Sequence, residues 1–275
     1  MSAAGPRLWC RGNRQLLSLR SPPPEAVLSI LTIRPRSGVE LIDASFQFYR
    51  ENLSLLLTTT LTAFAPIALF EYMSARDPGD VTVSLSTQLV TWFFAALAQA
   101  ATIEIVATRY MGEDITPADA LRAVWKRIGT VLAVTVVYGL VVGLGVILLV
   151  IPGIYVATKY FAAMAAAMVE GHRVGRAMER SGELTVGSKL RILGIFFVVL
   201  LVYIVLAAGV AVAVEAVATP PVAALAVRLL MGVTNPLGFI LVTLLYFDLR
   251  IRREGLDIDL MMARAPGPVA VPAAG

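Results

Sequence analysis

Acidic and basic side chains inside strongly apolar segments are the residues of this sequence most suited to chemistry. Such groups are costly in a bilayer, so they commonly mark sites of binding or transport. Four of them fall near span ends that we expect on the outer side of a membrane: Glu71, Lys159, Glu215 and Arg228. They form a candidate outer polar cluster that could bind a lipid headgroup. The alternative is that each side chain reaches the interface independently.

A further acid, Glu104, lies inside another apolar segment, which also carries Gln88 and Gln99. Polar side chains in such positions commonly form hydrogen bonds between helices, each worth about 1 kcal/mol. Glu104 is therefore a candidate intramembrane acid with two interpretations. It either joins helices or belongs to a path for protons or substrate.

Residue types that enzymes and metal sites require are scarce. The chain has one histidine, His172, and one cysteine, Cys10. A single cysteine excludes an intramolecular disulfide and a cysteine metal cluster. The sequence also lacks the His-Glu-x-x-His motif of metalloproteases and the glycine-rich loop that holds nucleotide phosphates. We therefore expect no catalytic activity, no metal and no cofactor.

The composition is that of a membrane protein. Hydrophobic residues make up 58% of the 275 residues, charged residues make up 15%, and the mean hydropathy is +0.79. A helix needs roughly 20 apolar residues to cross a bilayer. Six such segments cover residues 53–73, 85–108, 129–151, 154–169, 190–217 and 222–247. We predict an all-α, polytopic integral membrane protein with six transmembrane helices, in which Pro152-Gly153 turns the chain between the third and the fourth.

The lysines and arginines indicate which way the spans run. All 23 except Arg76, Lys159 and Arg228 lie before the first span, after the last span or in the two loops that would share their side. Basic residues accumulate on the cytoplasmic side of membrane proteins. This distribution predicts that both termini are cytoplasmic.

Three segments on the predicted cytoplasmic side combine an apolar stripe with basic residues, as helices lying in an interface do. The predicted stripes are Ile42, Phe46, Tyr49 and Leu53; Leu121, Val124, Trp125 and Ile128; and Val174, Ala177, Met178 and Ser181. The second segment starts with a helix cap at Thr116-Pro117. Six basic residues are candidate contacts for lipid or a partner: Arg122, Lys126, Arg127, Arg173, Arg176 and Arg180. The chain is either three units of interfacial helix plus membrane hairpin, or a set of ordinary basic loops beside a bilayer.

Glycine and proline residues suggest how the spans pack. Gly139 and Gly143 form a pair of small residues that we expect to bring the third and fourth spans close together. Pro66 and Pro236 are expected to kink the first and the sixth span. The carbonyl groups that such kinks release either line a cavity or are satisfied by packing.

The ends of the chain differ from the spans. Residues 1–31 are basic and contain Pro22-Pro23-Pro24, without the apolar core of a secretory signal. We predict a disordered N-terminal extension over residues 1–31, a six-span membrane domain over residues 32–262 and a disordered C-terminal tail over residues 263–275.

Four stretches of the sequence resemble a known family. They are Leu41 to Asn52, Ile151 to Tyr155, Arg180 to Thr185 and Tyr246 to Asp257. They are similar to the bacterial and archaeal family named for the membrane domain of glycerophosphoryl diester phosphodiesterases, and the chain departs from it at Gly182, where an aromatic residue is expected. The resemblance implies a stand-alone membrane domain in a bacterial plasma membrane. The catalytic barrel, which needs roughly 250 residues, has no room in this chain.

The function that these features favour is a non-enzymatic membrane scaffold that binds lipid or a partner. The expected partners are membrane lipids and a membrane protein, and nucleic acid is not expected, because the net charge of +4 is explained by basic helix ends. The alternatives are a small transporter or lipid translocator, and an intramembrane enzyme acting on lipid.

Overall fold

Helices and the segments that join them make up the described part of the chain, residues 35–74, 81–215 and 219–256 of the computed structural model. The chain divides into two units, Met1–Thr32 and Ile33–Gly275, and every described residue belongs to the second. The predicted N-terminal extension and C-terminal tail lie outside the described residues. The described ranges contain no strand.

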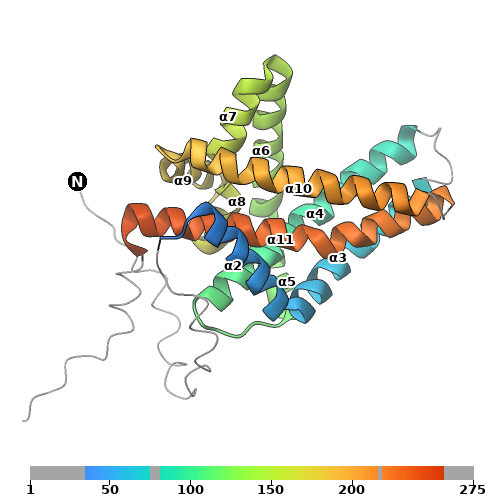
Figure 1. Ribbon diagram of the computed structural model, residues 1–275, viewed down its shortest axis with the longest axis horizontal. Coiled ribbons are helices and arrows are strands. Elements are labelled where there is room, and N and C mark those ends of the chain that lie inside the picture. The colour runs from blue at the N-terminus through green and yellow to red at the C-terminus, as the bar shows by residue number, and fades with distance from the viewer. Residues whose placement is uncertain (1–34, 75–80, 216–218, 257–275) are drawn as a thin grey trace, which may run out of the picture. The chain divides into compact units, whose positions relative to one another are not determined.

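The helices follow one another in the order that the apolar segments predict (Figure 1). They are α2 (Gly38–Glu51), α3 (Leu53–Ser74), α4 (Val81–Tyr110), α5 (Pro117–Lys126), α6 (Ile128–Leu148), α7 (Val150–Tyr160), α8 (Ala163–Val169), α9 (Val174–Thr185), α10 (Lys189–Glu215) and α11 (Pro220–Glu254). Six stretches of helix are long and apolar enough to cross a membrane: Leu53–Ser74, Val81–Tyr110, Ile128–Leu148, Val150–Val169, Lys189–Gly209 and Leu230–Glu254. The protein is therefore a polytopic, all-helical membrane protein, and the prediction of six spans is confirmed.

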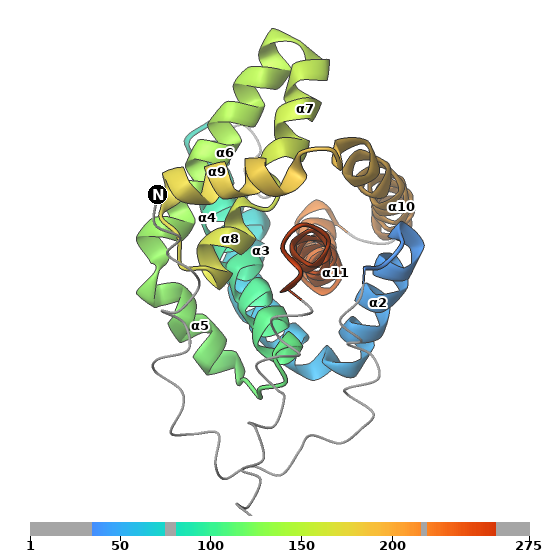
Figure 2. The same cartoon turned by 90° about the vertical axis from the view of Figure 1, so that its left-hand side faces the viewer.

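A short amphipathic helix precedes each pair of candidate spans. α2 precedes α3 and α4, α5 precedes α6 and α7, and α9 precedes α10 and α11. The two helices of a pair are not always each other's main packing partners. α11, for example, has a more extensive contact with α3 than with α10, the helix that precedes it. Figure 2 faces the end of the molecule where α5, α9 and the last turns of α11 lie, which we call the amphipathic end.

Polar side chains fix where the amphipathic helices begin. The hydroxyl oxygen of Ser37 accepts from the Glu40 N–H at 3.2 Å, and the Glu40 carboxylate accepts from the Ser37 N–H at 2.6 Å. At α5, Thr116 accepts from the Asp119 N–H at 3.2 Å, and Pro117 occupies the first turn. Both arrangements satisfy N–H groups that a helix start leaves without an internal partner. The predicted cap at Thr116-Pro117 is confirmed.

α3, α4 and α11 form the packed centre of the molecule. Figure 2 looks along α11 and shows α2, α3, α8 and α10 around it. Between α3, α4 and α11, the buried side chains of Ala63, Phe64, Ile67 and Ala98 pack together, with Phe94, Met231 and Phe239 against them. Toward the amphipathic end, the rings of Tyr110 and Phe247 stack with centroids 4.4 Å apart and join α4 to α11.

Pro236 releases a carbonyl group in α11, and the structure shows what satisfies it. Proline has no N–H to donate to the carbonyl four residues earlier, which belongs to Gly232. The hydroxyl of Thr60 on α3 shares its proton between that carbonyl, at 3.1 Å, and the Leu56 carbonyl of its own helix, at 2.8 Å. The hydroxyl of Tyr49 on α2 donates to the next carbonyl, that of Val233, at 2.7 Å. Packing of α2 and α3 on α11 therefore satisfies these groups, so they do not line an open path.

The turn between α6 and α7 differs from the predicted one. The chain reverses at Leu149, which is extended (φ −163°, ψ 136°), and Pro152 and Gly153 already lie in the first turn of α7. Proline is tolerated there because the first N–H groups of a helix have no internal partner. Pro152-Gly153 thus begins the fourth span and does not form the turn.

The two helices of this hairpin meet at other glycines than predicted. A Cβ on Gly145 would lie 2.9 Å from the Cα of Gly153, and a Cβ on Gly153 would lie 2.7 Å from the backbone nitrogen of Val146. Cβ positions on Gly139 and Gly143 face no atom of α7 within 4 Å. The predicted contact through Gly139 and Gly143 was wrong, because the close approach is beside the turn.

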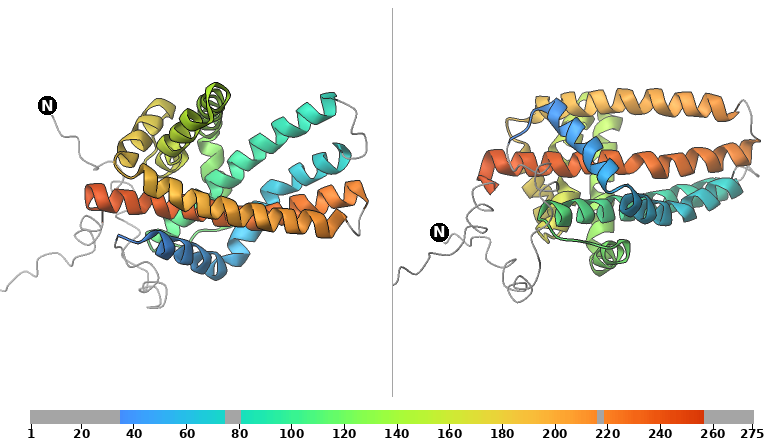
Figure 3. Two further views of the ribbon diagram at one scale, coloured as in Figure 1. Left: turned by 45° about the horizontal axis from the view of Figure 1, so that its top comes forward. Right: turned by 60° about the horizontal axis from the view of Figure 1, so that its bottom comes forward.

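The α6–α7 hairpin runs across the other long helices. Figure 1 shows α3, α4, α10 and α11 extending in one general direction, and α6 and α7 pointing away from them. The right-hand view of Figure 3 shows α10, α11 and the α3–α4 pair aligned in this way. At the hairpin tip, residues 147–151 are all apolar and exposed. The direction of this hairpin was not predicted from the sequence.

The buried faces of the amphipathic helices correct two of the three predicted stripes. α9 buries Ala177, Met178 and Ser181 as predicted. α2 instead buries Leu41, Ala44, Ser45 and Phe48 and leaves Phe46 and Leu53 exposed. α5 buries Ala120 and Val124, whereas Trp125 is 58% exposed. Both helices carry apolar residues on two sides, and packing against the neighbouring helices decides which side is buried.

Candidate functional site

A network of ion pairs and hydrogen bonds lies at the amphipathic end, where α8, α9 and α11 meet. Its members are Glu170, just after α8; Arg180 on α9; and Tyr246, Arg250 and Glu254 on α11. We call it the Glu170 network. The three α11 residues are spaced by four, so they follow one face of that helix.

The Glu170 carboxylate is the centre of this network. It accepts a hydrogen bond from Arg180 Nε at 2.9 Å and one from the Tyr246 hydroxyl at 2.5 Å, and it lies 3.7 Å from Arg250 Nε. His172 Nε2 lies 2.9 Å from the same carboxylate. The side chains of Glu170 and Arg180 are only 15% and 14% exposed. Removing one partner of such a pair leaves a poorly solvated charge, at a cost of about 3–5 kcal/mol.

Glu254 closes the network on the other side of Arg180. Its carboxylate accepts from Arg180 Nη2 at 2.7 Å and from Arg250 Nε at 3.2 Å. The charges of two glutamates thereby neutralise those of two arginines, and these contacts hold α9 against the end of α11.

The charges of this network are fixed by one another. Burial alone would raise the pKa of Glu170, but the hydrogen bond from Tyr246 and the charges of Arg250 and Arg180 outweigh burial and hold that pKa below its usual value. Burial alone would lower the pKa of Arg180, but Glu254 and Glu170 raise it above its usual value. Both groups therefore stay ionised at neutral pH, which suits a structural joint more than a proton donor.

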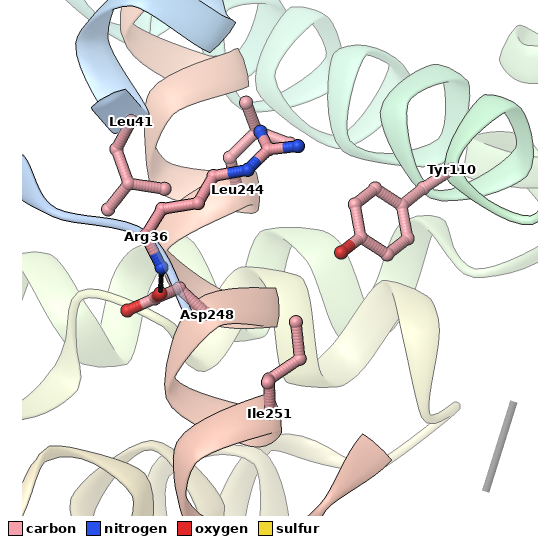
Figure 4. Close-up of a pocket in the computed structure, with 6 residues that line it drawn as sticks. All are labelled: Arg36, Leu41, Tyr110, Leu244, Asp248 and Ile251. Carbon is pink, nitrogen blue, oxygen red and sulfur yellow. Dashed lines mark hydrogen bonds between the residues drawn. The ribbon is translucent and has the colours of Figure 1, made fainter. Parts of the chain in front are cut away.

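A second network surrounds Asp248, which is 2% exposed. Its carboxylate accepts from Arg191 Nη1 at 2.6 Å, from Arg252 Nε at 2.9 Å and from the backbone N–H of Arg36 at 2.7 Å (Figure 4). The carbonyl of Arg36 accepts in turn from the same two guanidinium groups, at 2.5 and 2.7 Å. This Asp248 network joins the segment before α2 to α10 and α11.

Little space remains beside Asp248. The cavity there has a volume of about 10 Å³, and Figure 4 shows the side chain of Arg36 extending through it toward Leu244 and Tyr110. That volume holds about one water molecule. The Asp248 network is therefore a joint between helices and not a ligand site.

The six basic candidate contacts fall into two kinds. Arg180 belongs to the Glu170 network, and Arg127 Nη1 donates to the carbonyl groups of Ala167 and Met168, at 3.2 and 2.6 Å, at the end of α8. These two arginines hold helices together. The other four are exposed and form no hydrogen bond or ion pair with another helix among the described residues: Arg122, Lys126, Arg173 and Arg176. Arg176 forms ion pairs within α9, so its charge is partly neutralised.

The exposed face of α5 combines cations with an aromatic ring. Arg122, Trp125 and Lys126 share this face because they are three and four residues apart. The opposite face holds Ala120 and Val124, which are buried. Arg122 also lies 3.1 Å from a carboxylate oxygen of Asp119, whose side chain is exposed as well.

The structure describes the side chains of two members of the predicted outer polar cluster, Lys159 and Glu71. Lys159 lies beside α9, since its Cε is 3.2 Å from the place of a Cβ on Gly182. Glu71 lies on α3, which packs mainly on α4 and α11. The structure thus does not bring Lys159 to Glu71, because the fourth span breaks after Tyr160 and Lys159 lies at this break. The side chains of the other two members, Glu215 and Arg228, lie outside the described residues, so their part of the cluster stays a prediction.

α9 caps the break between α7 and α8. The hydroxyl of Ser181 donates to the Lys159 carbonyl at 2.9 Å and accepts from the Ala162 N–H at 3.1 Å. The Thr185 hydroxyl also donates to the Lys159 carbonyl, at 3.2 Å. The break is therefore a defined feature with satisfied backbone groups.

A cavity of about 310 Å³ lies between α4, α6, α10, α11 and the broken span. Its lining includes Gln99 and the aromatic rings of Tyr138, Tyr160, Phe161 and Phe196. The volume is within the range of sites that bind small molecules. Glu104, the candidate intramembrane acid, is partly buried on α4 near the charge of Arg127 and does not line this cavity.

Comparison of the chain with protein-family models, with curated proteins and with solved structures gives no match.

The sequence pattern did not reveal the partners in either network. Glu170 and Tyr246 are 76 positions apart, and no periodicity connects a loop acid to a helix hydroxyl. The one feature of the sequence that could have indicated these networks is the run of charged residues at the end of the last span. Asp248, Arg252 and Glu254 stand there on an apolar helix, where an unpaired charge would be costly.

Proposed function

We propose that the protein is a non-enzymatic membrane protein whose amphipathic end faces the cytoplasm and binds an anionic membrane surface. The observation that carries this proposal is the exposed face of α5, where Trp125 accompanies Arg122 and Lys126. Tryptophan favours the boundary between water and lipid. Each basic residue near an anionic surface adds roughly 1 kcal/mol of attraction.

The remaining charges support this assignment to α5. Arg127 and Arg180 are occupied by carbonyl and carboxylate groups of the protein itself. Lys126 and Arg122, whose ion pair with Asp119 stays within α5, are exposed in the short helix that joins two spans. The excess of lysine and arginine in the N-terminal part, the C-terminal part and these loops supports a cytoplasmic position.

We also propose that the chain is a stand-alone membrane domain of the bacterial family that its four stretches resemble. Two of these stretches meet in space, since Arg180 of one binds Glu254 of another. Such a contact supports the idea that the stretches belong to one module. A plasma-membrane location belongs to the same proposal.

Extraction of the protein with its surrounding native lipid, followed by mass spectrometry, tests the main proposal. The wild-type protein should carry more anionic lipid than the bulk membrane, and Arg122→Gln with Lys126→Gln should bring the composition toward the bulk value. Arg173→Gln is the matched control on another helix. Unchanged enrichment in the double variant would contradict the proposal, and a stoichiometric protein lost with the same variant would identify a partner as the occupant.

Lipid translocation is a second candidate function, and the cavity beside Gln99 is the observation that favours it. A translocator needs this cavity to open to water on one side at a time. Single cysteines at positions 99 and 138, in a variant without Cys10, should then react with a water-soluble thiol reagent. Complete protection at both positions would exclude this function.

A further inference from the structure

Two lysines and a tyrosine meet where α7 passes the start of α10. Lys189, the first residue of α10, donates to the Tyr155 hydroxyl at 2.5 Å, and its ammonium group lies 4.0 Å from the centre of the Tyr155 ring. Lys159 is one helical turn after Tyr155 and therefore lies on the same face of α7. Two ammonium groups and a hydroxyl thus border one site, which we call the lysine pair site.

These lysines differ from the arginines of the two networks. Among the described residues, neither Lys159 nor Lys189 forms an ion pair with a carboxylate, and their close contacts are tyrosine rings. In the Glu170 network, by contrast, every arginine has an acidic partner. Both ammonium groups act electrostatically on the Tyr155 hydroxyl, and two cations around one hydroxyl without an acidic partner favour the binding of an anion.

Gly182 leaves room for one of the two lysines. A Cβ at this position would lie 3.2 Å from Lys159 Cε and 4.0 Å from Lys159 Cγ. The aliphatic part of Lys159 therefore crosses α9 where a larger side chain would displace it. The position of the ammonium group depends on the absence of a side chain at residue 182.

The cavity of about 310 Å³ borders the same helices. Tyr160 belongs to both sites: its ring lines the cavity, and its centre lies 4.9 Å from Lys159 Nζ. Phe196, which also lines the cavity, follows Lys189 by seven residues and so lies on the same face of α10. Its ring meets that of Phe161 with centroids 5.3 Å apart. A cationic border thus adjoins a space lined by aromatic and apolar side chains.

We infer that the lysine pair site and this cavity together bind one anionic lipid. The phosphate group lies between Lys159, Lys189 and the Tyr155 hydroxyl, and an acyl chain enters the cavity past Tyr160. Ammonium groups are established binders of phosphate. The start of α10 is an end of a membrane span, which is the depth of lipid headgroups. This site involves other helices than α5, so the inference goes beyond the proposed function.

Binding of palmitoyl lysophosphatidic acid to the purified full-length protein, measured by native mass spectrometry, tests the inference. One molecule should bind per chain, and palmitoyl lysophosphatidylcholine should bind more weakly. Lys159→Gln with Lys189→Gln should lower the affinity about thirtyfold, because each basic residue contributes roughly fivefold. Lys159→Arg with Lys189→Arg should retain most of the binding. Arg50→Gln, which removes an exposed charge from the last turn of α2, should leave it unchanged.

Three results would overturn the inference. The first is wild-type affinity in the double glutamine variant, or in Lys189→Gln alone if the double variant does not fold. The second is equal binding of inorganic phosphate, which would show that the site takes a free anion and that the cavity holds no chain. The third is equal loss with Arg50→Gln, which would indicate a general effect of charge. The Lys159 and Lys189 variants should keep the lipid enrichment that we assign to the α5 face. The inference about the lysine pair site and the proposed function of α5 are therefore tested independently.

Discussion

The spans that pack together are less apolar than the spans that remain exposed, which is the opposite of the arrangement in soluble proteins. α3, α4 and α11 have mean hydropathies of 1.8, 1.7 and 1.7 in their candidate spans, and 39–50% of those residues are buried. The spans in α6 and α10 reach 2.7 and 2.9, yet only 11% and 12% of their residues are buried. The most apolar helices therefore lie outside, where lipid would surround them.

The packed helices show why the less apolar sequences are inside. α4 buries a run of alanines around Ala98, which lets its neighbours approach closely. Buried hydroxyl groups such as those of Thr60 and Thr102 donate to backbone carbonyls. Because lipid is as apolar as leucine, spans associate through small residues and hydrogen bonds and gain little from burying leucine. This difference between the two groups of helices predicts four effects of decreasing size.

Asp248→Ala should cause the largest loss of stability. It would leave Arg191 and Arg252 without their carboxylate at a buried joint of α10 and α11, at a cost of about 3–5 kcal/mol. The free energy of unfolding in mixed micelles measures this loss. Glu179→Ala, which removes an exposed acid from α9, is the matched control and should cost at most about 1 kcal/mol. Similar losses in the two variants would contradict the central position of α11.

Acidification should open the Glu170 network. Since the pKa of Glu170 is lowered in the folded protein, its carboxylate contributes stability that is fully present above the unfolded pKa of 4.5 and is lost as the pH falls through the lower folded-state pKa. Glu170→Gln should therefore be less stable than the wild type at neutral pH, and the difference should shrink below pH of about 4. Unfolding free energies of both proteins across this range provide the test. A difference that stays constant with pH would show that the carboxylate charge does not stabilise the joint.

The same alanine-to-leucine substitution should lower stability more inside the packed centre than outside it. Ala98→Leu adds volume where α3, α4 and α11 meet, and should cost about 1–3 kcal/mol through overpacking. Ala208→Leu makes the same change at an exposed position of α10 and should stay within about 0.5 kcal/mol. Thermal unfolding in one lipid mixture compares the two. Equal effects would remove the distinction between the packed and the exposed helices.

Thr60→Val should have the smallest effect of the four. It deletes the hydroxyl that satisfies the carbonyl released by Pro236, and a hydrogen bond between membrane helices is worth about 0.6 kcal/mol on average. Thr62→Val is the control, because both hydroxyls donate to a carbonyl of their own helix and only that of Thr60 also reaches α11. A loss confined to the control, or shared by both variants, would show that the bond to α11 contributes nothing.

The sequence predicted the number and order of spans because hydropathy and length depend on no partner. It could not predict which side of each helix is buried. α6 and α10 are apolar all round, so no stripe marks a packing face, and α2 and α5 offer two apolar sides each. Trp125 illustrates the difficulty, because a tryptophan at a water–lipid boundary and one in a core fit the same periodicity.

The candidate sites were predicted only in part. Lys159 was identified from its cost in an apolar segment, but its position beside Gly182 and α9 was not predicted, because it depends on the break after Tyr160. The Glu170 network was not predicted, because its acid, its arginines and its tyrosine come from three separate helices or helix ends. Such contacts depend on how α9 crosses α11, which local patterns do not encode.

A map of the residues that touch lipid in the unmodified protein would test this arrangement of packed and exposed spans without any substitution. Reconstitution with a lipid that carries a photoactivatable group in its acyl chain, followed by irradiation and peptide mass spectrometry, gives this map. We predict adducts on exposed residues of α6 and α10 such as Leu144 and Val205, and none on Ile67, Ala98 or Leu245. Equal labelling of both groups, or labelling mainly on α3, α4 and α11, would contradict the claim that the less apolar spans form the packed interior.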